Sequence, residues 1–339
     1  MTLADHTIVQ LIDSKHCGGI ETHILQLSRW LRAHGLNTEV VFLARYGAAH
    51  PLERPLRESG IRVKYLDGPG ALFRLIFNQR VILATHGYKA GILGRMVARC
   101  CGTPVISTFH SGDPGAGKLA LYSRLDEMTA GLAQRIICVS GRIQSRLNVQ
   151  SSVIPNFVKA HRIPRKPGDQ IAFVGRLSQE KGPDLFTNIA AAFKDPSQFH
   201  IYGDGPLRTT LQVHNPRMTF HGHVKMEQHW HKVGLLCITS RFEGMPLVAL
   251  EAMSRGIPVI AYAVGDLHQL IDHHQNGWLI PQGERDTFIK HVQLWQSLSP
   301  VERQLVSDSA RKTVAEHYDS QVVCPRIVDQ YAAAIQAAR

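Results

Sequence analysis

Apolar runs of five to seven residues recur along the chain, and longer amphipathic segments separate them. The segment at 20–35, for example, carries apolar residues at helical spacing and ends at Gly35. Short, nearly continuous apolar runs that alternate with helical segments are typical of a parallel β-sheet covered by helices on both faces. In the first half of the chain we predict strands at residues 7–12, 38–44, 62–66, 80–85, 104–109 and 135–140.

The same alternation starts again after residues 151–170, a stretch rich in proline and polar residues. We therefore predict an α/β protein with two Rossmann-like, doubly wound parallel-sheet domains and a linker near 155–168. Ligands of open parallel sheets bind beyond the carboxyl ends of the strands, so we expect two such sheets to face a cleft. The strands predicted in the second half are residues 170–175, 199–203, 218–222, 234–240 and 257–262.

The charge of the chain is unevenly distributed. The 339 residues carry a formal net charge of +11, and residues 1–160 hold 19 Lys and Arg against 10 Asp and Glu. The remainder holds 19 against 17. A basic first half favours a polyanionic partner, which could be nucleic acid, an acidic membrane surface or a phosphorylated substrate. A general solubility charge explains the same numbers equally well.

The sequence carries none of the usual signs of export. No apolar run reaches the roughly 18–20 residues of a membrane span, and the N-terminus lacks the basic start and apolar core of a signal peptide. There is no CxxC pair, so we expect free, buried thiols in a cytoplasmic protein. The six cysteines are Cys17, Cys100, Cys101, Cys138, Cys237 and Cys324.

Two glutamates stand eight positions apart in the stretch SRFEGMPLVALEAMSRGIPVIA, which begins at Ser240. Pro246 suits the first turn of a helix that follows a strand, so Glu243 should lie in the loop before that helix. Glu251 falls inside the helix among apolar neighbours, where a carboxylate needs hydrogen-bond donors. Vicinal ribose hydroxyls would supply two donors, and N–H groups at the helix N-terminus would donate hydrogen bonds to a phosphate or sugar oxygen. The alternative is a capping glutamate and a surface glutamate.

Three other segments place polar groups at strand ends. Arg176 and Lys181 follow a predicted strand and precede a helix that opens at Pro183, an arrangement suited to a diphosphate. Gly18-Gly19 precedes a helix and would let the backbone approach a phosphate, although such pairs usually mark turns. His110 directly follows a strand and could hydrogen-bond a sugar hydroxyl. Solvated surface residues remain the alternative for each segment.

Several familiar motifs are missing from the sequence. We find no GxGxxG, HExxH, Walker A or GxSxG motif, and no Asp-x-Asp that would hold a metal-bound diphosphate. The histidine-rich stretches at 221–231 and 273–278 lack a regular ligand spacing, so solvated histidines are expected there. We therefore predict no metal and no cofactor.

The glycine pair, the His110 segment, the Arg176–Lys181 segment and the Glu243–Glu251 segment, in this order along the chain, resemble those of the retaining family 4 glycosyltransferases, which have the GT-B fold. The resemblance spans nearly the whole chain, and the Glu-x7-Glu pattern of Glu243 and Glu251 is its most specific part. It also rests on GGIETHILQLSRWLRAHG (18–35), THGYKAGILGRMVARCCGTPVISTFHS (85–111), VIPNFV (153–158), FVGRLSQEKG (173–182) and IYGDGPL (201–207). The final helical segment resembles the helix that returns to the first domain in that family.

The resemblance implies the roles of individual residues. Glu251 would bind the ribose of a nucleotide sugar, Glu243 the donor sugar, and Lys181 the diphosphate. The implied catalytic residues are His110, Arg176, Lys181 and Glu243. The implied donor-binding residues are Gly18, Gly19, Arg176, Lys181, Val224, Glu243, Gly244, Met245, Pro246, Leu247 and Glu251. The family pattern has Gly and Glu where this chain has Asp266 and Gln269, so donor preference or loop shape could differ here.

The resemblance also implies a domain division and an activity. Residues 1–158, with a crossing helix at about 317–339, would bind the acceptor, and residues 159–316 would bind the donor. The expected reaction moves a hexosyl unit from a UDP- or GDP-sugar to a glycan or lipid-linked acceptor without metal and with retained configuration. We expect cell-surface polysaccharide or lipopolysaccharide synthesis, no nucleic-acid partner, and peripheral contact with the inner face of an anionic membrane. The arginines expected at that contact are Arg29, Arg32, Arg54, Arg57, Arg74 and Arg80.

Other functions remain open from the sequence. A sugar-nucleotide epimerase of the same fold would convert the donor without an acceptor. A phosphorylase or glycogen synthase of this fold is a weaker alternative, because a phosphorylase is a far longer chain with a pyridoxal-bearing lysine. A non-catalytic protein that binds nucleotide sugars or nucleic acid would use the basic first half, and its affinity for nucleic acid would fall with salt.

Overall fold

The computed structural model describes residues 2–110, 117–161 and 168–338. Its internal contacts divide the chain into two compact units. Unit 1 comprises Met1–Phe157 with Ser320–Arg339, and unit 2 comprises Val158–Asp319. Residues 162–167 of the predicted linker, and residues 111–113 after the predicted strand at 104–109, lie outside the described residues.

Unit 1 contains a seven-stranded parallel sheet with the order β3-β2-β1-β4-β5-β6-β7. The central strands are buried on both faces, which explains why their sequences are almost continuously apolar. The order reverses between β1 and β4, so the loops after these strands diverge at that point of the sheet edge. The strands are β1 (Thr7–Ile12), β2 (Thr38–Phe42), β3 (Arg62–Tyr65), β4 (Val81–His86), β5 (Val105–Phe109), β6 (Arg135–Cys138) and β7 (Ser152–Val153).

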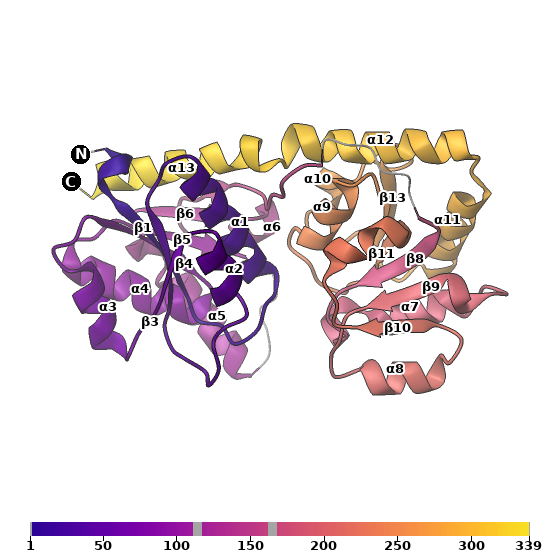
Figure 1. Cartoon of the computed structure of the whole chain (residues 1–339), viewed down its shortest axis with the longest axis horizontal. Coiled ribbons are helices and arrows are strands. Elements are labelled where there is room, and N and C mark those ends of the chain that lie inside the picture. The colour runs from indigo at the N-terminus through magenta and orange to yellow at the C-terminus, as the bar shows by residue number, and fades with distance from the viewer. Residues whose placement is uncertain (1, 111–116, 162–167, 339) are drawn as a thin grey trace. The chain divides into compact units, whose positions relative to one another are not determined.

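Helices cover both faces of this sheet (Figure 1). Helix α13 (Ser320–Ala337), from the end of the chain, packs beside α1 (Gly19–Ala33) and against β5 and β6. Its residues Ile327 and Tyr331 join a core with Ile8 and Ile106 of the sheet. The other helices of unit 1 are α2 (Glu53–Glu58), α3 (Pro69–Ile76), α4 (Tyr88–Cys101), α5 (Lys118–Met128) and α6 (Gly141–Gln144), with short 3-10 turns at Leu3–Asp5 and Ala130–Leu132.

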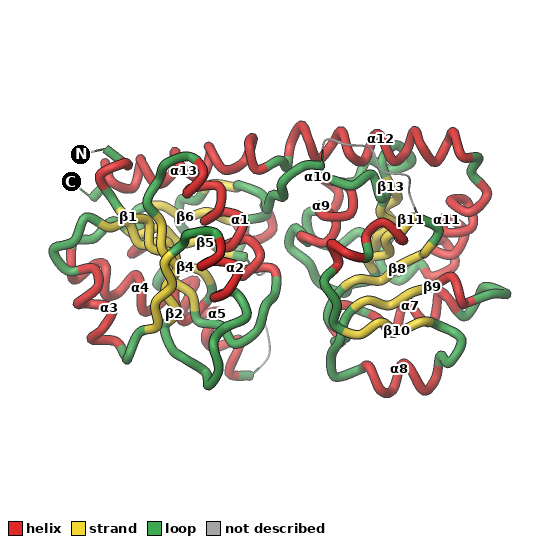
Figure 2. Tube along the Cα trace, in the orientation of Figure 1, coloured by secondary structure: helices red, strands yellow, loops and turns green. Residues whose placement is uncertain are grey.

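Unit 2 repeats this design with a six-stranded parallel sheet, order β10-β9-β8-β11-β12-β13 (Figure 2). Its reversal point lies between β8 and β11, which are paired neighbours. The strands are β8 (Gln170–Val174), β9 (Phe199–Tyr202), β10 (Thr219–Gly222), β11 (Val233–Ile238), β12 (Val259–Tyr262) and β13 (Gly277–Ile280). The helices are α7 (Pro183–Ala190), α8 (Arg208–His214), α9 (Leu247–Met253), α10 (Leu267–Leu270), α11 (Arg285–Ser297) and α12 (Pro300–His317).

The structure differs from the sequence-based prediction in a few places. Strands β7 and β13 were not predicted, because β7 has only two residues and β13 directly follows the polar residues 272–276. Pro246 does not open α9 but precedes it with extended backbone, at φ −71° and ψ 122°. Cys17 and Cys100 are exposed, so the prediction of buried thiols is wrong for these two residues. Among the described residues, no helix combines the length and apolar character needed to cross a membrane.

Candidate active site

In unit 2, a close backbone contact brings together the loops that follow β8 and β11. Gly182 has φ +63° and packs so tightly that a Cβ there would lie 2.2 Å from the carbonyl oxygen of Thr239. The Thr239 hydroxyl donates a hydrogen bond to the Gly182 carbonyl oxygen at 2.7 Å. Only glycine fits this left-handed, crowded position without strain. The contact fixes the turn that carries Lys181 beside the end of β11.

Lys181 and Glu243 form an ion pair across these two loops. The Lys181 ammonium donates to both carboxylate oxygens of Glu243, at 2.7 and 2.9 Å. The Ser240 hydroxyl donates to the same carboxylate at 2.7 Å. The Glu243 side chain is 8% exposed and that of Lys181 is 34% exposed, so the cation is on the solvent side of the pair. An ammonium has three donors, and this pair leaves one of them to a ligand.

Glu251 lies within α9, and its side chain is half-buried. Burial raises the pKa of Glu251 to about 7; the Arg255 charge opposes this shift, and the Glu227 charge adds to it. The Arg255 guanidinium donates to the backbone carbonyl of Glu251 at 2.7 Å rather than to its carboxylate. Among the described residues, none donates a hydrogen bond to that carboxylate. A buried carboxylate in this state gains stability from any ligand that brings hydroxyl donors.

The backbone between Glu243 and α9 is held by the loop after β12. The Asp266 N–H donates to the Gly244 carbonyl oxygen at 3.0 Å. Gly265, at φ +58°, lies so close that a Cβ would be 2.4 Å from the carbonyl oxygens of Glu243 and Gly244. The segment that departs from the family pattern therefore packs directly on the Glu243 loop. It shapes this loop through backbone contacts.

The remaining residues predicted to bind the donor occupy varied positions. Arg176 is exposed in the turn after β8 and, like Lys181, follows the carboxyl end of that strand. Val224 is half-buried and packs against the core of unit 2. Met245 and Leu247 are buried, so their backbone groups, rather than their side chains, are what they could offer to a ligand.

In unit 1, the ends of β4 and β5 bring two histidines together. His86 Nδ1 and His110 Nε2 lie 2.9 Å apart, at hydrogen-bond distance. His86 Nε2 lies 2.7 Å from the Gln10 side-chain oxygen. The Gln10 amide nitrogen in turn donates to the Tyr331 hydroxyl at 3.2 Å. A continuous chain of hydrogen bonds thus runs from α13 through β1 and β4 to His110.

This chain determines which nitrogen of each ring carries the proton. The Gln10 oxygen can only accept, so His86 must donate from Nε2 and accept at Nδ1. His110 then donates from Nε2, and its Nδ1 keeps a free lone pair. Burial lowers the pKa of His86 and His110 well below 6.5, as does the neighbouring His23. Both rings are therefore neutral at physiological pH, and His110 is positioned as a hydrogen-bond acceptor.

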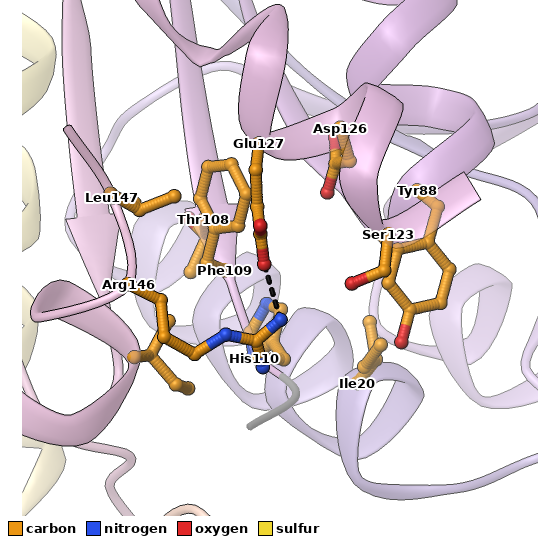
Figure 3. Close-up of a pocket in the computed structure, with 12 residues that line it drawn as sticks. Ile20, Tyr88, Thr108, Phe109, His110, Ser123, Asp126, Glu127, Arg146 and Leu147 are labelled. Carbon is orange, nitrogen blue, oxygen red and sulfur yellow. Dashed lines mark hydrogen bonds and ion pairs between the residues drawn. The ribbon is translucent and has the colours of Figure 1, made fainter. Parts of the chain in front are cut away.

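His110 also lines a small cavity of about 50 Å³ in unit 1 (Figure 3). The cavity lies among the ends of β4 and β5 and helix α5, with Tyr88 and Ser123 on its wall. Arg146 and Glu127 form an ion pair at its rim. A volume of this size holds a few water molecules or a small substituent such as a hydroxyl group. The cavity therefore suits one sugar hydroxyl rather than a whole ring.

The predicted glycine pair is the start of α1. Gly18 is the residue before the helix and Gly19 is its first residue. The Glu21 carboxylate accepts the Gly18 N–H at 2.8 Å, so this donor is already bound by an anion. A phosphate would compete with Glu21 for Gly18, which leaves Gly19 as the better predicted contact.

Two groups of three histidines have ring nitrogens within 4.8 Å of one another, His23 with His86 and His110, and His273 with His274 and His291. In the first group, both ring nitrogens of His86 are already at hydrogen-bond distance from His110 and Gln10. In the second group, His273 Nδ1 accepts from the Leu279 N–H at 3.1 Å, which leaves the proton on Nε2. Neither group presents three free lone pairs to a cation.

Several residues of this arrangement were not predicted as site residues. His86 ends a strand just as His110 follows one, so the same rule would have selected it. Gln10 is a single polar residue inside an apolar strand, which is itself a signal of a buried partner. The sequence identified Ser240 only as the last residue of a predicted strand and gave no sign of its hydrogen bond to Glu243. The pairing of Lys181 with Glu243 had no local signal, because 62 positions separate them.

Each half of the chain matches a known protein family. Residues 17–162 match the family described as Glycosyltransferase Family 4. Residues 168–295 match the family described as Glycosyl transferases group 1. The O-antigen biosynthesis glycosyltransferase WbnH of Escherichia coli is 30% identical over 282 residues, which cover 76% of this chain and 80% of WbnH.

Other relatives support the same assignment. The Escherichia coli UDP-Gal:alpha-D-GlcNAc-diphosphoundecaprenol alpha-1,3-galactosyltransferase is 28% identical over 261 residues, covering 65% of this chain and 67% of that enzyme. The structure of Anabaena HepE in complex with UDP-glucose superposes with a TM-score of 0.81 at 18% identity, covering 96% of this chain and 98% of HepE. This likeness confirms the predicted GT-B fold of two Rossmann-like domains.

Proposed function

The chain belongs to the family 4 glycosyltransferases, and from that premise we propose that it moves a hexosyl unit from a UDP- or GDP-sugar to a glycan or lipid-linked acceptor. The pathway we propose is synthesis of cell-surface polysaccharide or lipopolysaccharide. WbnH is named for O-antigen synthesis, and the galactosyltransferase relative for a diphosphoundecaprenol acceptor. The observation that carries the proposal is the joint presence, in unit 2, of the Lys181–Glu243 pair and the half-buried carboxyl of Glu251 with its raised pKa.

We propose that Lys181 holds the diphosphate of the donor. Glu243 fixes the ammonium through two hydrogen bonds, so the third proton has a defined direction and a phosphate oxygen can accept it. Arg176, exposed in the same turn region, would add a second positive charge. Glu243 and the backbone of residues 244–247 would hold the donor sugar. Glu251 would accept hydrogen bonds from the two ribose hydroxyls.

The proposed reaction retains the anomeric configuration and uses no metal. The bond between the anomeric carbon and the diphosphate oxygen breaks, and the diphosphate leaves with the electron pair. The acceptor hydroxyl bonds to the anomeric carbon on the face that the diphosphate leaves, and its proton passes to a diphosphate oxygen. Lys181 and Arg176 stabilise the charge that develops on the leaving group. His110, neutral and held by His86, would accept a hydrogen bond from a sugar hydroxyl.

The first test is thermal stabilisation of the purified protein by UDP-, GDP-, ADP- and TDP-sugars, with chelator and then with Mg²⁺. A ligand that binds the folded protein raises its melting temperature by mass action. We expect one base to give a metal-independent shift, and Glu251→Gln to abolish most of it. The exposed Glu316→Gln is the matched control. A wild-type protein that no donor stabilises, even with acceptor present, would contradict the proposal.

A second assay separates transfer from other donor chemistry. Incubation of the bound donor with and without a lipid-linked glycan acceptor should yield product only with the acceptor. Conversion of the donor to an epimer without acceptor would favour the epimerase alternative. A glycosyl-enzyme adduct trapped by mass spectrometry would overturn the proposed attack from the leaving-group face.

A further inference from the structure

Helix α5 has its polar and apolar faces reversed relative to an ordinary surface helix. Its buried face carries Ser123 and Asp126. Asp126 accepts a hydrogen bond at 2.6 Å from Arg95 of α4, a side chain that is itself fully buried. Arg95 also donates to the Thr129 hydroxyl at 2.6 Å. Because these polar groups satisfy one another inside the unit, the apolar residues of α5 are directed outwards.

The outward face of α5 is a continuous apolar stripe. Leu121, Leu125, Met128 and Leu132 follow at intervals of three or four residues, which places them on one side of the helix and its extension. Leu121 is 60% exposed and Met128 is 75% exposed. Single exposed apolar residues are ordinary, but an aligned series indicates a surface that contacts something apolar.

The neighbouring helices α4 and α3 continue this stripe. Helices α3, α4 and α5 follow β3, β4 and β5, and successive crossovers in one direction place them on one face of the sheet, where they are neighbours (Figure 1). Met96 of α4 is 53% exposed. Phe73 and Phe77 of α3 are exposed with their rings stacked at 4.8 Å. Each helix also presents one exposed arginine: Arg74, Arg99 and Arg124.

This surface, which we call the α3–α5 face, comprises Phe73, Arg74, Phe77, Met96, Arg99, Leu121, Arg124, Leu125, Met128 and Leu132. It carries no exposed carboxylate among the described residues. The acids of the three helices are Asp126 and Glu127, and each is paired with an arginine. The arginines of α2 differ, because Arg54 and Arg57 pair with glutamates of their own helix. The α3–α5 face therefore combines exposed apolar side chains with a net positive charge among the described residues.

We propose that the α3–α5 face docks on an anionic lipid bilayer. The apolar side chains would enter the headgroup region, and the three arginines would contact lipid phosphates. Charge decides between a bilayer and a second copy of this chain. An isologous contact between two such faces would bring like charges together with no carboxylates to balance them. The face differs from the arginine set predicted from sequence, of which Arg74 alone belongs to it.

Docking would bring the enzyme to a lipid-linked acceptor, and only this role of the α3–α5 face rests on the proposed function. The test measures flotation of the whole protein with vesicles of phosphatidylglycerol and phosphatidylcholine, against vesicles of phosphatidylcholine alone. We expect binding to the anionic vesicles. The double variant Leu121→Gln with Met128→Gln should lower the partition coefficient by at least about tenfold, since both side chains would leave the lipid. Arg99→Glu with Arg124→Glu should lower it several-fold.

Two control variants sharpen the test. Val301→Gln with Leu305→Gln replaces equally exposed apolar residues of α12 in unit 2 and should leave flotation unchanged. Arg54→Glu with Arg57→Glu changes the α2 arginines and should have a smaller effect than Arg99→Glu with Arg124→Glu. Melting temperature and donor binding are measured for every variant, so that loss of fold or of the donor site is separated from loss of docking.

Three outcomes would overturn the proposal. The wild-type protein could bind donor yet fail to float with anionic vesicles. The α2 variant could abolish flotation while the Leu121 and Met128 variant floats normally, which would place the contact on α2. Light scattering could show a dimer that the Leu121 and Met128 variant dissociates, which would assign the face to a second copy of the chain.

Discussion

The two units share one sheet design but differ in the chemistry at their reversal points. In unit 1, the strands at and next to this point end in neutral, hydrogen-bonded histidines whose proton positions are fixed by Gln10. In unit 2, they lead to an ion pair between Lys181 and Glu243 and to the half-buried carboxyl of Glu251. A common backbone places ligand groups at one edge, and the side chains decide which ligand is bound.

This difference shows how two domains with the same fold can bind different chemical groups of a ligand. Fixed charge and a cation directed at solvent suit a charged diphosphate. Neutral rings with a defined lone pair suit a hydroxyl group, because they orient a proton without attracting a counterion. Substitutions at the two sites test this difference between a charged site and a neutral one, and Lys181 is expected to give the largest effect.

Lys181→Ala should lower turnover by about 10²–10³, the size of losing one group that stabilises developing charge. It removes the cation of the pair and leaves the Glu243 carboxylate with the Ser240 hydroxyl as partner. Initial rates at saturating donor and acceptor measure the effect. Lys194→Ala, at an exposed lysine of the same unit, is the matched control. A near-normal rate for the Lys181 variant would remove this residue from the mechanism.

Gly182→Ala should destabilise unit 2 and weaken donor binding together. The new Cβ would meet the Thr239 carbonyl, and an alanine at positive φ costs about 1–2 kcal/mol even without a clash. Gly283→Ala is the control, because Gly283 also has positive φ, at +89°, but has open space around it. Chemical denaturation and donor titration measure both effects. Equal losses in the two variants would show that the close contact at Thr239 is unimportant.

The affinity for donor should rise with pH because of Glu251. Burial raises its pKa to about 7 from 4.5, and ribose hydroxyls bind the ionised form better. Affinity should therefore increase by roughly tenfold between about pH 6 and pH 8, as the carboxyl loses its proton. Glu251→Gln should bind weakly, with a flat profile. Calorimetric titration across this range checks it, and an equally steep rise in the variant would exclude Glu251 as the cause.

The same group should affect stability in the opposite direction. The folded pKa is raised, so the folded state holds a proton that the unfolded state has lost between about pH 4.5 and pH 7. The stability of the wild-type protein should fall across this interval relative to Glu251→Gln. Melting temperatures of the two proteins at both ends of the interval measure the difference. A constant difference would contradict the raised pKa.

His86→Phe should lower turnover by up to about tenfold with little change in donor affinity, since one hydrogen bond that orients His110 is lost. His86→Asn, whose side-chain oxygen can still accept from His110, should recover part of the rate. If His86 had only a structural role, the two variants would have equal turnover once both are shown to fold. His214→Asn, at an exposed histidine, serves as control.

Much of the fold followed from the sequence because its signals are local. Residues 7–12 and 170–174 form strands where apolar runs predicted them, and α1 ends before Gly35 as expected. The apolar neighbours of Glu251 indicated a buried carboxylate, and the structure shows a half-buried side chain whose pKa is raised. Strand β13 was not predicted because Gly277–Ile280 directly follows the polar residues 272–276, which include two histidines.

Local patterns in the sequence were enough to identify the strands, the turns and the residue types that could bind a nucleotide sugar. Which of these residues come into contact depends on how the strands pair in the folded chain. Lys181 reaches Glu243, and His86 reaches His110, because β8 pairs with β11 and β4 with β5. The outward face of α5 also depended on Arg95, whose buried charge draws Asp126 inwards and turns the leucines to the surface. Such pairings join residues that are distant in the chain, and no local pattern encodes the distance between them.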